Sequence, residues 1–314
     1  ASGFIGNCLI LSLKKNKNFI TRVVTRKSES MLIADEIFII QGIDKFTEWQ
    51  AILKDVDVVV HLAGRAHILN DTADNPLKEF IEINYNGTIN LARQSVKANI
   101  KRFIFISSIG VNGSKKKVGI PLSTASSPNP DRAYATSKLM AEIALEEISI
   151  HTNMEVTIIR PPLVYGSNAP GNFEKLMTAI VEGKYLPLGS INNKRSFIYL
   201  DNLVDLIICC LTHPKAANET FMVSDNRDLS TTELVNLMYK SLKLPSKLIS
   251  IPERLLYNFL ILIGKKELAQ SLCDSQQADI TKTFKLLGWQ PAVKMEAAFA
   301  KTAQHFLDKR VNKP

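Results

Sequence analysis

The sequence predicts an α/β fold in which a doubly wound parallel sheet is followed by a smaller C-terminal α/β domain. Up to about residue 160, short apolar segments rich in Val, Ile and Phe alternate with longer helical segments. This is the pattern of strands buried in a parallel sheet and of the helices that cover them. Beyond that point the alternation loosens. At 314 residues, 46% of them hydrophobic, the chain is long enough to bury a large core.

The strands and helices are expected in this order. Strands are predicted at 20–25, 37–41, 56–62, 102–106 and 156–159. Helices are predicted at 77–99, at 133–149 and from Ser230 to 242, where Ser230 and Glu233 have the spacing of a capping box. The apolar segment 255–263 is shorter than the roughly 20 residues that a membrane-spanning helix needs. We therefore expect a buried helix there, with contact to a membrane surface as the alternative.

Composition and charge exclude several classes of protein. The net charge of +9 comes from scattered Lys and Arg residues, with one tight run at 115–117, and no nucleic-acid-reading motif accompanies it. We expect a solvated loop at this run and no nucleic-acid partner. The four cysteines form no metal-binding or disulfide pattern, which favours reduced thiols in a cytoplasmic protein without a metal site.

The chain opens on Gly3-Phe4-Ile5-Gly6. A glycine turn that leads into a helix lets the backbone approach a pyrophosphate and places the helix N-terminus beside it. A plain turn is the alternative interpretation. Because no strand precedes this turn, we expect the chain to lack the first strand of the sheet. Arg26, followed by Lys27, stands where a dinucleotide site reads the ribose, so NADP is allowed as well as NAD; a surface cation is the alternative.

A second group of residues points to proton transfer. Tyr134 and Lys138 lie four positions apart in a predicted helix, so both side chains project from one face. A nearby ammonium favours the phenolate and lowers the tyrosine pKa toward the range of a general acid/base. Ser108 ends the fourth strand and supplies a hydroxyl for the same substrate oxygen. Tyr239 and Lys243 repeat the spacing and are interpreted as an ordinary helix surface pair.

Taken with Asn84 in NYNGT and with RPPLVYG at 160–166, these motifs resemble the extended short-chain dehydrogenases/reductases, specifically the NAD-dependent epimerase/dehydratase family of nucleotide-sugar enzymes, along essentially the whole chain. The resemblance implies a Rossmann-type sheet and a bound NAD or NADP. It makes Ser108, Tyr134 and Lys138 catalytic. The cofactor contacts that it implies are Gly3, Phe4, Ile5, Gly6, Arg26, Asp44, Leu62, Ala63, Gly64, Asn84, Tyr134, Lys138 and Pro161.

The resemblance also implies a substrate site. Its predicted contacts are His67, Ser108, Asn172 and Arg195, with Asp201 supporting the segment that carries Arg195. A structural or solvated histidine, a surface cation and a helix cap are the alternatives for His67, Arg195 and Asp201. Two positions depart from the glucose/galactose epimerase pattern. Asn112 replaces a tyrosine, and the segment around Asp274 lacks an expected arginine, which leaves the exact sugar and nucleotide open.

The function expected is a nucleotide-sugar 4-epimerase acting on a UDP-hexose or UDP-N-acetylhexosamine. The alternatives are an NADPH-dependent 4-ketoreductase of surface polysaccharide synthesis and a non-catalytic dinucleotide-binding protein; a dehydratase is disfavoured because no acid pair lies beside Ser108. We expect a dinucleotide-binding domain at 1–160, to which 194–212 returns, and a substrate-binding domain at 161–193 and 213–314. A homodimer is expected as the assembly.

Overall fold

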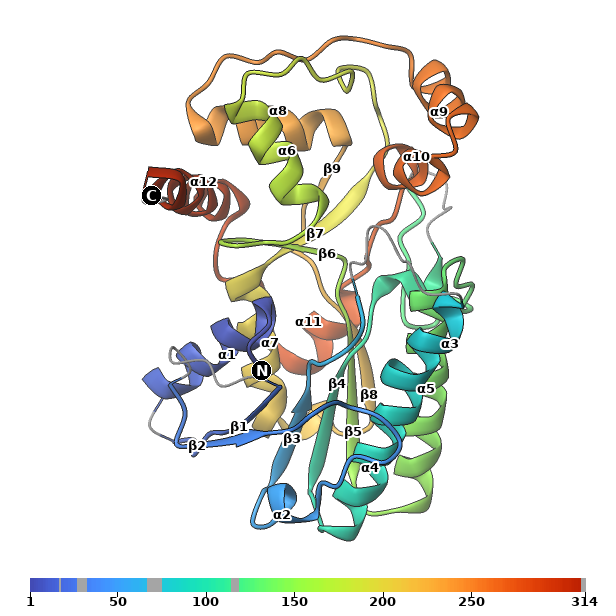
Figure 1. The fold of residues 1–314 in the computed structure, drawn as a ribbon, viewed down its shortest axis with the longest axis vertical. Helices are drawn as coiled ribbons and strands as arrows, with labels where there is room; N and C mark the ends of the chain where they lie inside the picture. Colours follow the sequence, from blue (N-terminus) through green and yellow to red (C-terminus); the bar gives the residue numbers. More distant parts are fainter. Residues whose placement is uncertain (17, 27–32, 67–74, 114–118, 312–314) are drawn as a thin grey trace.

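The computed structural model describes residues 1–16, 18–26, 33–66, 75–113 and 119–311. Its elements form two halves, which lie one below the other in Figure 1. The lower half is a parallel sheet with helices on both faces. The upper half is a smaller three-stranded sheet surrounded by helices. This is the α/β architecture expected from the sequence.

The sheet of the lower half has four parallel strands in the order β3-β4-β5-β8. They are β3 (Val58–His61), β4 (Arg102–Ile106), β5 (Glu155–Arg160) and β8 (Glu219–Met222). A separate parallel pair joins β1 (Arg22–Thr25) to β2 (Glu36–Ile39). The five predicted strands all occur, with bounds that differ by at most two residues from the predicted ones.

Helices cover both faces of this sheet (Figure 1). One face carries α2 (Gln50–Leu53), α3 (Pro76–Phe80), the π-helical segment η1 (Ile81–Asn86), α4 (Gly87–Lys97) and α5 (Ala133–His151). The other face carries α1 (Phe4–Lys15), α7 (Leu200–Thr212) and α11 (Thr281–Leu287). Side chains of β4 alternate between the two cores, Phe103 and Phe105 on the first face and Ile104 and Ile106 on the second, because successive residues of a strand point to opposite sides.

The upper half is organised around a sheet of order β6-β7-β9. Its strands are β6 (Leu163–Tyr165), β7 (Arg195–Tyr199) and β9 (Asp228–Leu229), and its helices are α6 (Asn172–Val181), α8 (Thr231–Leu242), α9 (Glu253–Leu262), α10 (Lys266–Cys273) and α12 (Met295–Val311). Two 3₁₀ turns, η2 (Ile109–Asn112) and η3 (Pro214–Ala216), complete the elements. The predicted capping box forms at the start of α8, with Ser230 and Glu233 bonded reciprocally.

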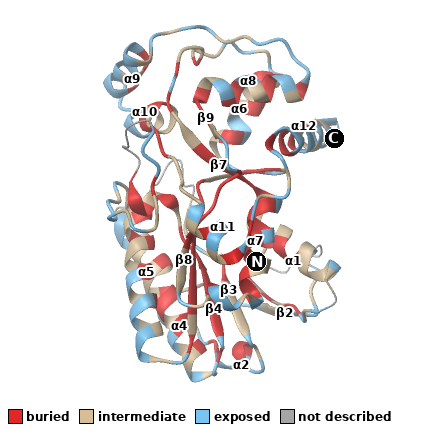
Figure 2. Cartoon of the chain, turned by 180° about the vertical axis from the view of Figure 1, so that it is seen from behind, coloured by how far each residue is buried: buried red, intermediate tan, exposed pale blue. Residues whose placement is uncertain are grey.

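Two details differ from the sequence-based picture. The segment 213–314 does not lie wholly in the upper half, because β8 pairs with β5 and α11 packs beside it in the lower one. The second difference concerns α9, which was expected to be a buried helix. Only Leu256 and Leu260 of α9 are buried, and Figure 2 shows this helix as largely exposed at the edge of the upper half.

Membrane-spanning character is not found in the described part of the chain. None of the helices there is both long enough and apolar enough to cross a bilayer.

Candidate active site

The glycine turn and the start of α1 lie at the carboxyl end of β1. The amino group of Ala1 donates to the carbonyl of Val24, 2.8 Å away. A Cβ on Gly6 would lie 2.1 Å from the Ala1 carbonyl oxygen, so only glycine fits there, whereas a Cβ on Gly3 would meet nothing within 4 Å. Gly3 is the N-cap of α1 and offers no side chain to the first amides of the helix. This end of the helix is therefore suited to an anion.

A second close approach occurs after β3, where Leu62, Ala63 and Gly64 follow the strand. A Cβ on Gly64 would lie 3.0 Å from Asn84 Oδ1 and 3.4 Å from Lys138 Nζ. Asn84 is completely buried within the π-helical segment. Its Oδ1 accepts from the Arg65 amide at 2.7 Å, while its Nδ2 donates to the Arg65 carbonyl and to Ser137 Oγ. One amide side chain thus ties the end of β3 to α5, which requires both its donor and its acceptor.

Lys138 lies at the carboxyl end of β4. Its Nζ donates to the carbonyl of Ile106 at 2.9 Å and sits 4.4 Å from the centre of the Phe105 ring. Burial lowers the pKa of Lys138 to about 8, against the opposing effect of Glu142. Ser108 follows the same strand, and its Oγ accepts from the amide of Gly110 at 3.0 Å. The carboxyl edge of a parallel sheet is where ligands bind in this architecture.

Tyr134 opens α5 one turn before Lys138. Its ring meets Phe80 edge-on, with the centroids 6.1 Å apart. The sequence predicts that Lys138 lowers the tyrosine pKa, but in the structure burial raises the pKa of Tyr134 to about 12. The physical reason is that burial removes water from the side chain and penalises its charged form. In the protein alone, Tyr134 is accordingly a protonated hydroxyl at neutral pH.

The remaining predicted cofactor contacts are placed as follows. Arg26 is exposed just beyond β1. Asp44 follows β2, and its Oδ1 accepts from the Phe46 amide and from Thr47 Oγ1, which closes a local turn. Pro161 follows β5, and its carbonyl accepts from the amide of Ile109 beside Ser108. Lys27 and His67 lie outside the described residues.

A buried ion pair lies behind this site and was not predicted from the sequence. Arg160 and Glu142 are both almost fully buried and approach to 2.5 Å. Arg160 also donates to Asn112 Oδ1, and Asn112 Nδ2 donates to the Ser126 carbonyl. Asn112, which replaces the tyrosine of the glucose/galactose epimerase pattern, therefore holds the loop after β4 against the end of β5. A charged residue within an apolar strand, as in EVTIIR, is the signal that predicts a buried partner.

The predicted substrate residues belong to the upper half. Asn172 occupies the first turn of α6. Arg195 begins β7, and its Nη1 donates to the carbonyls of Ser271 and Asp274 at 3.1 and 3.2 Å. Asp201 lies in the first turn of α7 and accepts a hydrogen bond from Cys8 of α1, so it contacts the helix that follows the glycine turn.

Arg132 lies close to Arg195 and was not predicted from the sequence. Burial, then the charge of Arg132, lowers the pKa of Arg195 to about 10, although Asp274 opposes the shift. Arg132 Nε is buried and has no hydrogen-bond partner within the described part of the chain. Arg132 immediately precedes Ala133 and Tyr134 at the start of α5. Two guanidinium groups, one from each half, thus interact, and one of them belongs to the residue two positions before the predicted general acid/base.

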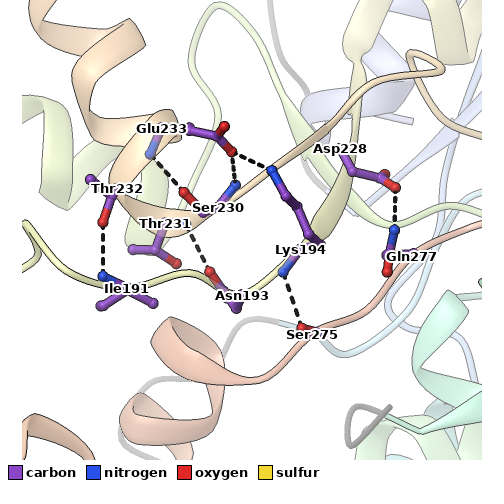
Figure 3. A network of polar contacts seen from close by, with 10 residues as sticks. All are labelled: Ile191, Asn193, Lys194, Asp228, Ser230, Thr231, Thr232, Glu233, Ser275 and Gln277. Carbon is purple, nitrogen blue, oxygen red and sulfur yellow. Dashed lines mark hydrogen bonds and ion pairs between the residues drawn. The ribbon is translucent and has the colours of Figure 1, made fainter. Parts of the chain in front are cut away.

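The segment that holds Arg195 is itself fixed by a polar network (Figure 3). Asn193 Nδ2 donates to the carbonyls of Leu272 and Asp274, and its Oδ1 accepts from the Thr231 amide. The amide of Lys194 donates to Ser275 Oγ. These bonds join the entry to β7, the start of α8 and the end of α10, so the Asp274 carbonyl that accepts from Arg195 is held in place.

The sequence of this chain is similar to those of known proteins. A sequence model of the NAD dependent epimerase/dehydratase family matches residues 1–224. The chain belongs to this family. It is 40% identical to a UDP-glucose 4-epimerase of Vibrio cholerae over 98% of this chain and 94% of that protein. It is also 31% identical, over 73% of this chain and 72% of that protein, to an N-acetyl-α-D-glucosaminyl-diphospho-ditrans,octacis-undecaprenol 4-epimerase of Escherichia coli O157:H7.

The fold is also similar to that of solved structures. The solved structure of UDP-glucuronic acid 4-epimerase from Bacillus cereus in complex with NAD superposes with a TM-score of 0.79 at 20% identity, covering 99% of this chain and 97% of that one. The predicted family, fold class and nucleotide-sugar epimerase activity are confirmed, and NAD is the cofactor of the family. The reductase alternative has less support. The roles of the individual site residues remain predictions, as do the domain bounds apart from the placement of β8 and α11.

Proposed function

We propose that this chain is a UDP-sugar 4-epimerase that oxidises the 4-hydroxyl of the sugar and reduces the resulting ketone on its other face. The observation that carries this proposal is the arrangement at the carboxyl end of β4. A buried lysine bonds the last carbonyl of β4, a tyrosine lies one helical turn before it, and a serine follows the same strand. Arg132, two residues before the tyrosine, interacts electrostatically with Arg195. Such a site combines proton transfer with recognition of a diphosphate.

The residues present fit a bound dinucleotide. The uncapped start of α1 beyond Gly3 suits its pyrophosphate, and the absence of a side chain at Gly64 lets the backbone after β3 lie close against Asn84 and Lys138. Arg26 is proposed to face the adenine ribose. When bound, NAD accepts a hydride from the sugar carbon and returns it. The Lys138 ammonium is proposed to hold the ribose hydroxyls and to stabilise the Tyr134 phenolate.

Proton transfer is assigned to Tyr134. Its oxygen takes the proton of the 4-hydroxyl during oxidation and returns it during reduction, while Ser108 Oγ holds the same sugar oxygen by a hydrogen bond. The high pKa of the tyrosine in the protein alone, about 12, keeps its hydroxyl protonated, so that it carries the proton that the second step requires. The first step needs the phenolate, which Lys138 stabilises from one turn away on the same helix.

The diphosphate is assigned to Arg195 together with Arg132. Arg195 keeps donor groups beyond the two backbone bonds it makes, and Arg132 brings a buried Nε without a partner in the described structure. Two nearby like charges repel, and an anion between them removes that repulsion. Arg132 thereby replaces the arginine that the segment around Asp274 lacks.

Turnover of candidate substrates tests this function. The full chain is incubated with UDP-glucose, with UDP-N-acetylglucosamine and with a nucleotide-linked 4-keto sugar, each with and without added NADPH. Interconversion at C4 without net cofactor consumption is expected. Stoichiometric oxidation of NADPH on a 4-keto sugar, without epimerisation, would establish the reductase instead.

The arginine pair is tested by binding. Arg132→Met and Arg195→Met are each expected to raise KM by roughly tenfold or more, the scale of a lost charged hydrogen bond. Arg227→Met is the control, because Arg227 pairs with Glu296 on the exposed surface. If KM for the UDP-sugar is unchanged in both variants, the diphosphate lies elsewhere.

A lipid-linked sugar diphosphate is the second candidate substrate. The E. coli relative is named for such a substrate, and the guanidinium pair recognises a diphosphate whatever it is joined to. The specific observation in its favour is a row of exposed apolar side chains on α9, the helix packed against the α10 that holds Arg195. Epimerisation of undecaprenyl-diphospho-N-acetylglucosamine in detergent, compared with that of UDP-N-acetylglucosamine, distinguishes the two.

Assembly and compartment stay proposals as well. We propose a homodimer formed through the outer face of α5, where Ile143 and Ile150 are 57% and 77% exposed one above the other. Sedimentation of the wild type and of Ile143→Ser tests it, with a monomeric wild type as the contrary result. The free thiols of the four cysteines support a cytoplasmic setting.

A further inference from the structure

Helix α9 exposes an apolar stripe. Leu255, Phe259 and Leu262 are 63%, 57% and 84% exposed, and their spacing places them on one helical face. The opposite face, with Leu256 and Leu260, is buried against the rest of the upper half. The next residue, Ile263, is also exposed at 45% before Gly264 ends the helix with a φ of +74°. Four of the large apolar side chains within these nine residues thus form or border the stripe, and Ile261 is also exposed, at 39%.

The charge beside this stripe is positive at both of its ends. Arg254 on α9 and Lys265 and Lys266 directly after it are exposed. Two carboxylates lie close by in the chain, the half-buried Glu253 and the exposed Glu267. The exposed cations outnumber the carboxylates and flank the stripe at both ends.

We propose that α9 docks on an anionic lipid bilayer, with the stripe inserted at the headgroup boundary and the flanking cations on the lipid phosphates. An interfacial helix combines an apolar face with Lys and Arg at its border, and each such cation near an anionic membrane adds about 1 kcal/mol of attraction. The proposal does not depend on which sugar nucleotide is turned over.

A second copy of the chain fits this surface less well. Two copies docked through α9 would bring Arg254, Lys265 and Lys266 of each against the same cations of the other, which is unfavourable. Three or four side chains also fall short of the about 800 Å² per partner that a stable interface buries. An anionic bilayer removes the charge repulsion and needs no complementary shape.

The docked helix lies beside the substrate site. Helix α9 packs against α10 (Figures 1 and 2), and the carbonyls of Ser271 and Asp274 at the end of α10 accept from Arg195. Docking therefore places the diphosphate-binding side of the upper half near the membrane surface. A sugar diphosphate carried by a lipid reaches the site from that side.

Co-sedimentation with vesicles tests the proposal. The full chain is mixed at low salt with vesicles of phosphatidylcholine alone and with vesicles that also contain phosphatidylglycerol. Binding to the anionic vesicles is expected to exceed binding to the neutral ones at least tenfold. It is also expected to weaken in 0.5 M salt, because salt at this concentration screens the attraction between surface charges. Phe259→Ser/Leu262→Ser and Lys265→Glu/Lys266→Glu are each expected to lower the binding at least tenfold.

The matched control is Ile20→Ser/Phe46→Ser, which removes an aliphatic and an aromatic side chain that are 87% and 77% exposed far from α9 along the chain; its binding is expected to equal that of the wild type. Circular dichroism and turnover of a UDP-sugar check that every variant is folded. Equal sedimentation with both kinds of vesicle, or undiminished binding by Phe259→Ser/Leu262→Ser, overturns the proposal. So does a larger wild-type assembly in solution that this double variant dissolves, because the stripe is then covered by a second copy.

Discussion

The same five-residue pattern, a tyrosine followed four positions later by a lysine, occurs in both halves with opposite results. In α5, Lys138 is buried and its Nζ reaches the carbonyl of Ile106 at the edge of the sheet. In α8, the helix ends at Leu242, and Lys243 is the C-cap with φ 56° and ψ 36°. Tyr239 is 3% exposed in the upper core, and its hydroxyl has no hydrogen-bond partner in the described structure.

A spacing of four positions between a tyrosine and a lysine is therefore not enough to form a catalytic pair. Two side chains four positions apart share a face only while the helix continues through both of them. In α5 the helix runs a further thirteen residues beyond Lys138, up to His151, and the paired face meets the carboxyl end of β4. In α8 the left-handed cap turns Lys243 away from Tyr239. Substitutions at the tyrosine and the lysine of each helix are expected to have different effects in α5 and in α8.

Replacing the two tyrosines gives the largest difference. Tyr134→Phe removes the proposed proton carrier, so kcat is expected to fall roughly 10²-fold or more, the contribution of a general acid/base. NAD binding, measured by titration, is expected to persist. Tyr239→Phe is the control, with kcat close to that of the wild type. Near-full activity of Tyr134→Phe would remove this residue from the mechanism.

The two lysines give the next contrast. Lys138→Met keeps the length of the side chain but removes the charge that stabilises the Tyr134 phenolate, so kcat is expected to fall about tenfold to 10²-fold. Lys243→Met, on the exposed cap, is expected to leave kcat unchanged. Steady-state rates of both variants over pH 6–9 test the contrast, and equal rates for the two would show that Lys138 has no part in the chemistry.

His61, buried behind Lys138, makes the stability of the lower half dependent on pH. Burial, then the charge of Lys138, lowers the pKa of His61 from 6.5 to about 3, and its Nε2 lies 2.9 Å from Thr88 Oγ1. The unfolded chain therefore binds a proton below pH 6.5 while the folded one does not. The stabilisation is complete above pH 6.5 and is lost as the pH falls from 6.5 toward 3.

The loss from this group is expected to be about 1–2 kcal/mol between pH 6.5 and 5. Urea unfolding of the wild type and of His61→Gln at both pH values measures it. The glutamine variant is expected to lack this part of the pH dependence. The same slope in both proteins would assign the dependence to other groups.

The smallest effect concerns the cap of α8. A non-glycine residue in the left-handed region is strained, so Lys243→Gly is expected to stabilise the protein by up to about 1 kcal/mol. Thermal unfolding measures this change. Lys240→Gly, within the same helix, is the matched control and is expected to destabilise by about the same amount. A destabilised Lys243→Gly would mean that the lysine side chain makes a contact that outweighs the strain.

The sequence by itself determined the lower half and its family. The features that the sequence predicts are local patterns: buried β-branched segments, the glycine turn, and the positions of Ser108, Tyr134 and Lys138. A local pattern can be recognised from its own residues, without knowing which distant residues contact it in the fold. The capping box at Ser230 was readable for the same reason, since both of its residues lie within one helical turn.

Only the tertiary structure decided which distant residues meet. Arg132 and Arg195 lie 63 positions apart in the chain and interact because α5 and β7 begin near each other in the fold. The carbonyls that hold Arg195 come from the end of α10, and a backbone carbonyl carries no sequence signal. The exposure of α9 was not predictable either. A run of nine apolar residues has the same sequence pattern whether neighbouring elements cover one face of the helix or both faces. Its uncovered face depends on how the upper half packs around it.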